Sequence, residues 1–256
     1  MLHPFSMIQF IILIYSFVIG AAIGSFANML VYRVHFKKPL NGRSFCDFTG
    51  QDLGVKDLIP IVSYLVYRGR CRVCHDRLPL LYPAVELTFA ISTVLLSAIF
   101  LEKHTVLPVA IFFIISFWTL MITGLYDLLY WKLPSAVLKT AIPVLVIFRL
   151  VLVILYPQLL DPMLTGLEMM LVFAAVSAVF IRLTGGAGMS SAEPLLFAFV
   201  GLVLPVGLII PALLLTLFTG TFLGLIRMSA TRNMQQKIQL APVLAFGTLA
   251  AFLMFF

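Results

Sequence analysis

Long apolar segments recur along this chain, and they restrict its fold more than any other feature. A helix needs about 20 consecutive apolar residues to cross a bilayer. Windows of this kind lie near residues 8–32, 82–101, 106–126, 136–156, 166–184, 193–204, 206–226 and 240–256. Hydrophobic residues make up 62% of the 256 positions, whereas soluble domains contain roughly half. The sequence therefore predicts an all-α polytopic membrane protein with about eight transmembrane helices. Only Pro205 separates the sixth window from the seventh, so seven or nine spans stay open.

The basic residues predict the orientation of these spans, because Lys and Arg concentrate in cytoplasmic loops. No Lys or Arg precedes the first apolar window, and Arg33 follows it. With eight spans, 15 of the 17 basic residues fall on the inner side, while Lys103 lies outside and Arg149 lies within a span. We expect a multi-pass protein in a lipid bilayer with both termini outside. The net charge of +7 follows from this topology and does not indicate nucleic-acid binding.

Residues 34–80 form the only sizeable polar segment of the chain. They hold all three cysteines and four aspartates, and they fall between the first two predicted spans. A segment of this size buries little apolar surface, and such domains usually need a metal or a similar cross-link. The predicted organisation is a first transmembrane helix (1–33), a cytoplasmic cysteine-containing domain (34–80) and a membrane-embedded core (81–256).

The cysteines of the polar segment have the spacing of a metal site. They are Cys46, Cys71 and Cys74. The last two supply one Cys-x-x-Cys pair, half of a tetrahedral zinc site, and a cytoplasmic location favours metal over a disulfide. Upstream, Thr49 stands where a second pair would have its other cysteine. Asp47 or His75 could complete a zinc site, and a metal-free remnant held by packing is the other interpretation.

Two acidic residues, Asp127 and Glu193, sit at the edges of apolar windows, on the predicted cytoplasmic face. Ionisable groups at membrane depth are costly and commonly functional. Two carboxyl groups that share one proton form the catalytic machinery of aspartic proteases. The pair is thus the candidate catalytic site. As structural alternatives, Asp127 could cap a helix or pair with Lys132, and Glu193 could be a first-turn acid stabilised by a helix dipole.

Several motifs resemble, in order and along nearly the whole chain, those of the type IV prepilin peptidases. They are Gly24-Ser-Phe-Ala-Asn28, Arg68-Gly-Arg-Cys71-Arg-Val-Cys74, Tyr82-Pro-Ala-Val-Glu86, Asp127-Leu128 with Leu133-Pro134, and Lys237-Ile-Gln-Leu-Ala-Pro242. The resemblance implies an aspartic endopeptidase of the bacterial inner membrane. Such enzymes remove the basic leader of prepilins and pseudopilins on the cytoplasmic side, for type IV pili or type II secretion. Many also methylate the new N-terminus with S-adenosylmethionine.

The chain departs from that family at residues of chemical importance. The family's second catalytic motif is Gly-x-Gly-Asp followed by a Lys. Here Glu193 replaces the Asp, Ser190 and Ala192 replace the glycines, and Leu195 replaces the Lys. Two hypotheses stay open: an active peptidase that uses Asp127 and Glu193, or an inactive homologue that binds prepilins or a pilus or secretion assembly.

Overall fold

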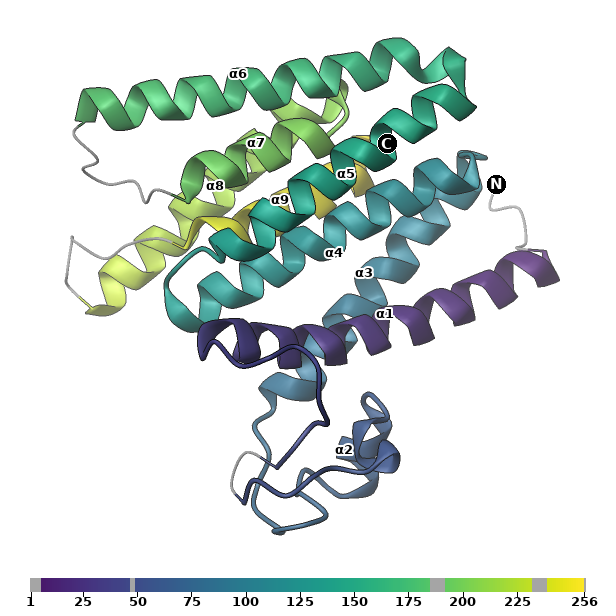
Figure 1. The fold of residues 1–256 in the computed structure, drawn as a ribbon, viewed down its shortest axis with the longest axis vertical. Coiled ribbons are helices and arrows are strands. Elements are labelled where there is room, and N and C mark those ends of the chain that lie inside the picture. Colours follow the sequence, from purple (N-terminus) through teal and green to yellow (C-terminus); the bar gives the residue numbers. More distant parts are fainter. Residues whose placement is uncertain (1–5, 47–48, 185–191, 232–238, 256) are drawn as a thin grey trace. The chain divides into compact units, whose positions relative to one another are not determined.

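The computed structural model describes residues 6–46, 49–184, 192–231 and 239–255 (Figure 1). Helices dominate these residues, and the bridges Phe45–Asp52 and Arg70–Arg77 are isolated. The long or apolar helices are α1 (Met7–His35), α3 (Leu81–Glu102), α4 (Leu107–Tyr130), α5 (Ser135–Leu155), α6 (Leu160–Thr184), α7 (Glu193–Val203), α8 (Val206–Thr231) and α9 (Leu240–Phe255). The short ones are η1 (Val55–Leu58), α2 (Val62–Val66) and η2 (Pro157–Leu159).

The helices confirm an all-α polytopic membrane protein. Among the described residues, five helices are long and apolar enough to span a membrane: α1, α3, α4, α5 and residues 164–183 of α6. Shorter apolar helices cover 193–203, 207–222 and 240–255. Each predicted window coincides with one of these helices. The orientation of the spans stays a prediction.

One helix boundary differs from its predicted position. The third window ended at residue 126, whereas α4 continues for one more turn to Tyr130. The apolar residues Leu128 and Leu129 extend the helix, and Trp131 ends it with a left-handed backbone (φ 55°). Asp127 therefore belongs to the last turn of a helix and does not follow it.

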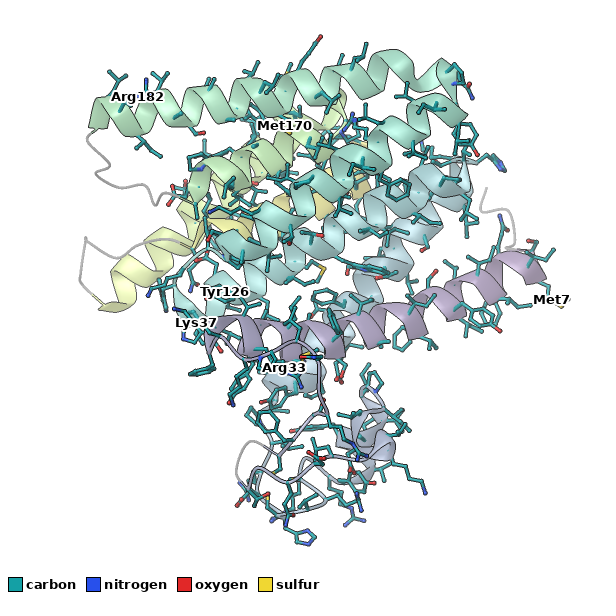
Figure 2. All side chains as sticks on the ribbon, in the orientation of Figure 1. Met7, Arg33, Lys37, Tyr126, Met170 and Arg182 are labelled. Atoms are coloured by element: carbon teal, nitrogen blue, oxygen red, sulfur yellow. The ribbon has the colours of Figure 1, made fainter. Side chains whose placement is uncertain are left out.

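The chain divides into two compact units, an N-terminal unit (Met1–His104) and a C-terminal unit (Thr105–Phe256). In the N-terminal unit, α1 packs along α3, and the polar segment joins them. Arg33, near the end of α1, is 4% exposed and donates hydrogen bonds to backbone carbonyls of residues 39–43 (Figure 2). The start of the polar segment is thus tied to α1. The predicted division at residues 33 and 80 stays a prediction.

In the C-terminal unit, the helices pack in pairs that bring distant segments together. α6 packs against α7 and α8 against α9, while α4 contacts both α5 and α9. The fully buried core side chains come from most of these helices and include Phe112, Leu145, Leu196, Phe199, Leu202 and Leu244. The contact between α4 and α9 places the start of α9 beside Asp127.

Candidate functional site

Asp127 is a buried acid at the end of α4. Its side chain is in the last turn of the helix and is 7% exposed. The backbone N–H of Ala241 donates a hydrogen bond to its Oδ2 at 3.3 Å. Ala241 lies in the first turn of α9, where N–H groups have no partner within the helix and the helix dipole favours a carboxylate. The end of one helix therefore meets the start of another at this carboxyl group.

Gln239 fastens this junction from the residue before α9. Its Nε2 donates to the carbonyl oxygen of Asp127 at 2.9 Å and to that of Leu128 at 3.0 Å. Gly124, one turn before Asp127, lets α9 approach, because a Cβ there would lie 3.1 Å from Pro242 Cα. Neither Gln239 nor Gly124 was among the predicted site residues. The polar Gln239 at the edge of an apolar window was the available signal.

Glu193 is the first residue of α7, with Pro194 at the second position. Its side chain is half-buried. Asp127 and Glu193 therefore each lie at a helix terminus of the C-terminal unit. Their catalytic role stays a prediction. Ser190, at the place of a motif glycine, lies outside the described residues.

The three cysteines form a compact cluster in the N-terminal unit. Their sulfur atoms all lie within 4.8 Å of one another. Cys46 Sγ lies 3.5 Å from Cys74 Sγ and 3.7 Å from Cys71 Sγ. Zinc–thiolate bonds of about 2.3 Å in a tetrahedron imply sulfur separations of about 3.8 Å. The donor set therefore fits a metal ion that prefers thiolates. His75 does not join this cluster, and Asp47 lies outside the described residues.

The cysteines sit on two turns with the same backbone hydrogen bonds. In the first turn, residues 46–50, Cys46 N–H donates to Gln51 and its carbonyl accepts from Gly50. In the second turn, residues 71–75, Cys71 N–H donates to Asp76 and its carbonyl accepts from His75. Gly50 (φ 72°) and His75 (φ 62°) occupy equivalent left-handed positions.

This equivalence places Thr49 at the position that Cys74 occupies in the second turn. The hydrogen bonds that close the first turn therefore match those of the second, although Thr49 stands where the second has a cysteine. Burial raises the pKa of the Cys74 thiol to about 12 in the absence of a metal. A bound cation would reverse this effect, because a ligating thiol is deprotonated.

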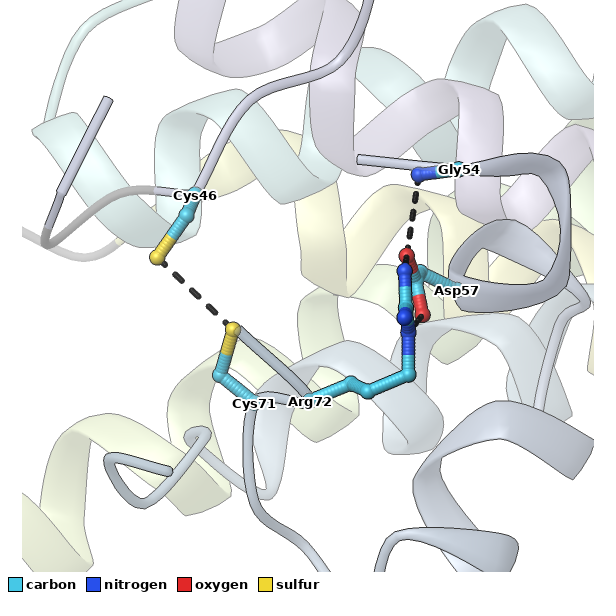
Figure 3. A network of polar contacts seen from close by, with 5 residues as sticks. All are labelled: Cys46, Gly54, Asp57, Cys71 and Arg72. Atoms are coloured by element: carbon cyan, nitrogen blue, oxygen red, sulfur yellow. Dashed lines mark hydrogen bonds and ion pairs between the residues drawn. The ribbon is translucent and has the colours of Figure 1, made fainter. Parts of the chain in front are cut away.

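An ion pair supports the second turn from the side. Arg72 donates to both carboxylate oxygens of Asp57, at 2.6 and 2.8 Å, and Gly54 N–H donates to the same carboxylate at 2.9 Å (Figure 3). The Asp57 side chain is 6% exposed and that of Arg72 is 52% exposed. The hydrogen bonds from Arg72 lower the pKa of Asp57 below its ordinary value. The pair connects η1 to the cysteine cluster.

A cavity of about 410 Å³ lies between α1, the start of α3 and the polar segment. Its volume is in the range of ligand pockets. Its lining includes Tyr32, Tyr64, Tyr67, Tyr82 and Glu86, together with two of the clustered cysteines. The cavity is therefore aromatic, with a carboxylate in its wall.

Glu86 holds a strained turn at the wall of this cavity. Its Oε2 accepts the N–H of Ile61 at 2.7 Å. Ile61 has φ 63° and ψ −48°, and Val62 N–H donates back to Pro60 O at 2.5 Å, which closes a γ-turn. A β-branched residue rarely adopts a positive φ, and such strain gathers at binding sites.

Comparison with known proteins finds relatives of one kind. Residues 18–100 match the family described as "Bacterial Peptidase A24 N-terminal domain". A prepilin leader peptidase/N-methyltransferase of Bacillus subtilis is 28% identical over 93% of this chain and 92% of its own length. One from Vibrio cholerae is 33% identical over 32% of this chain and 36% of its own. A type 4 prepilin-like proteins leader peptide-processing enzyme of Escherichia coli is 31% identical over 45% of this chain and 49% of its own length. No solved structure matches.

The fold and the two sites describe a polytopic α-helical membrane protein with a buried Asp127 and a half-buried Glu193 in one unit and a cysteine cluster in the other. With a family model matched over residues 18–100 and a relative aligned along almost the entire chain, the protein is similar to prepilin leader peptidases.

Proposed function

We propose that this protein is a membrane aspartic endopeptidase that cleaves the basic leader of prepilins or pseudopilins at the cytoplasmic face of the bacterial inner membrane. The observation that carries the proposal is the buried Asp127, whose carboxyl group accepts a hydrogen bond from the first turn of α9. The names of the relatives supply the substrate class. Both termini lie outside in this proposal, as the distribution of basic residues requires.

The proposed mechanism uses one proton shared by two carboxyl groups. The ionised member of the pair takes a proton from water, and that water attacks the scissile carbonyl. The protonated member polarises the carbonyl and then delivers its proton to the departing amine. The bond from Ala241 N–H orients the Asp127 carboxyl group, and Gln239 fixes the backbone that carries it.

Glu193 can serve in this pair only if α7 compensates for its extra methylene group. A displacement of about 1 Å costs on the order of a hundredfold in rate. Pro194 in the first turn favours a defined start of the helix. The replacements of glycines and lysine around Glu193 favour the alternative function, an inactive homologue that binds prepilins or a pilus or secretion assembly.

The test is cleavage of a model prepilin by the purified protein, beside Glu193→Gln and Glu193→Asp. We expect Glu193→Gln to abolish cleavage and Glu193→Asp to retain it, because only the latter keeps an ionisable group. Glu168→Gln, the same change at an exposed acid of α6, is the matched control and should cleave normally. No cleavage by the parent across several prepilins, with binding retained, would support the inactive homologue.

A second activity, N-methylation of the new N-terminus, is favoured by the aromatic cavity of the N-terminal unit. S-adenosylmethionine, when bound, supplies the methyl group. The tyrosines could stack on its planar base and face its positive sulfonium. Glu86 could take the proton that the amine loses as its bond to the methyl carbon forms and the carbon–sulfur bond breaks. Glu86→Gln should lower methylation of a synthetic mature N-terminus, and an unchanged rate would exclude this base.

We also propose that the cysteine cluster binds zinc in a structural role, through Cys46, Cys71 and Cys74. Thr49 leaves the fourth corner without a cysteine. Metal analysis of the purified protein tests this, with Cys74→Ser as the variant that should lose the ion. Equal metal content in both proteins would contradict the proposal.

A further inference from the structure

Arg149 is a buried cation inside a membrane helix. It lies six residues before the end of α5 at Leu155, and it is 4% exposed. A charge at this depth is costly unless it has partners. Its Nη1 donates a hydrogen bond to the carbonyl oxygen of Leu202, and its Cζ lies 5.7 Å from the centre of the Phe112 ring. The partners thus include a backbone carbonyl and an aromatic face.

The carbonyl that Arg149 binds belongs to the last turn of α7. This helix has 11 residues, about half the length needed to cross a bilayer. One end of α7 therefore lies within the membrane, where carbonyls of the last turn lack helical partners and water. A guanidinium there satisfies a carbonyl and opposes the negative end of the helix dipole. This pairing explains why a cation is tolerated at this position.

Two glycines of the same region leave room for Arg149 and for the close approach of α7 to α6. A Cβ on Gly166 of α6 would collide with the guanidinium group of Arg149. A Cβ on Gly201 of α7 would lie 2.6 Å from the backbone of Met169 in α6. The end of α7 is therefore fixed against α6 by close backbone contact and against α5 by Arg149.

We infer that Arg149 is a positioning residue: it sets the placement of α7, and thereby of Glu193 at the opposite end, relative to Asp127. A helix of 11 residues is rigid and about 16 Å long, so a shift of its anchored end reaches Glu193. The expected effect on cleavage rests on the proposed function, whereas the expected effect on the placement of α7 does not.

The experiment compares Arg149→Met, Arg149→Lys and Gly166→Ala by hydrogen–deuterium exchange of residues 195–203 and by cleavage kinetics. Arg149→Met removes the donor. Gly166→Ala leaves Arg149 in the sequence, but its new methyl group pushes the guanidinium group away from its present position. We expect both to raise exchange along α7 by about tenfold or more, and to lower kcat by about ten- to a hundredfold with little change in KM. Arg149→Lys keeps the charge but not the planar fork, and should fall between parent and Arg149→Met.

Thr216→Val is the matched control, since it deletes a buried side-chain donor to a backbone carbonyl, that of Ala212, within α8. It should leave exchange in α7 at the parental rate. Unchanged exchange in α7 of Arg149→Met and Gly166→Ala would overturn the inference, as would faster exchange with parental kcat. If the parent fails to cleave, the exchange measurement still decides the structural claim, so the two failures are distinguishable.

Discussion

The two units of this protein hold their candidate sites in different ways. In the N-terminal unit, Thr49 stands at the place that Cys74 has in the second turn, and the bonds that close the two turns match. In the C-terminal unit, the two candidate acids lie at helix termini: Asp127 is in the last turn of α4, beside the first turn of α9, and Glu193 begins α7. A local turn preserves its geometry through its own backbone bonds. A pair on separate helices preserves it only through their packing.

The largest effect is expected from replacing Gln239, which tests whether the candidate acids depend on helix packing. Replacing it with Leu removes both bonds to the end of α4 and leaves the carbonyls of Asp127 and Leu128 without that donor. We expect kcat for prepilin cleavage to fall by about ten- to a hundredfold, because the carboxyl group loses its fixed placement. Gln239→Glu tests whether a donor is needed, since the carboxylate cannot donate. Normal turnover by both variants would contradict the role given to this junction.

A smaller effect is expected in the N-terminal unit, where a change at Thr49 tests whether the first turn has kept its geometry. If the first turn has kept its geometry, Thr49→Cys should restore a fourth ligand without rearrangement. We expect roughly tenfold tighter zinc binding, or more, since structural zinc sites normally have four protein ligands. Competition with a chromogenic chelator measures the affinity. Thr49→Ser is the control and should match the parent, and an unimproved Thr49→Cys would show that the first turn no longer points its side chain at the metal.

The smallest expected effect concerns the ion pair between Arg72 and Asp57. The folded-state pKa of Asp57 is lowered by Arg72, so the pair adds stability above the unfolded value of about 3.9. That stability is lost as the pH falls through the lower folded pKa. Asp57→Asn should therefore lower the melting temperature by a few degrees at neutral pH, and the difference from the parent should shrink as the pH falls below about 3.9 and through the lower folded pKa. A difference that persists unchanged in acid would show that the loss is not electrostatic.

Much of the fold could be predicted because hydropathy records it directly. The eight apolar windows correspond to eight apolar helices, and the equivalence of Thr49 and Cys74 was visible in the spacing of the cysteines. The extension of α4 past Asp127 was missed, since a charged residue ended the apolar window while Leu128 and Leu129 carried the helix on.

The contacts that build the acidic site could not be predicted in the same way. Gln239 binds carbonyls more than a hundred positions away, and Arg149 binds the carbonyl of Leu202. Every residue has a backbone carbonyl, so the sequence does not indicate which carbonyl a given side chain will bind. Only the packing of α9 on α4 and of α7 on α5 identifies which carbonyls these side chains reach.

The most direct test of the account is the mass of the products that the parent, Asp127→Asn and Cys71→Ser release from one prepilin in the presence of S-adenosylmethionine. The account predicts a cleaved product from the parent and none from Asp127→Asn. It predicts that Cys71→Ser still cleaves, because the cysteine cluster is not part of the acidic pair. Cleavage by Asp127→Asn at the parental rate would contradict the central claim that Asp127 and Glu193 form the catalytic pair.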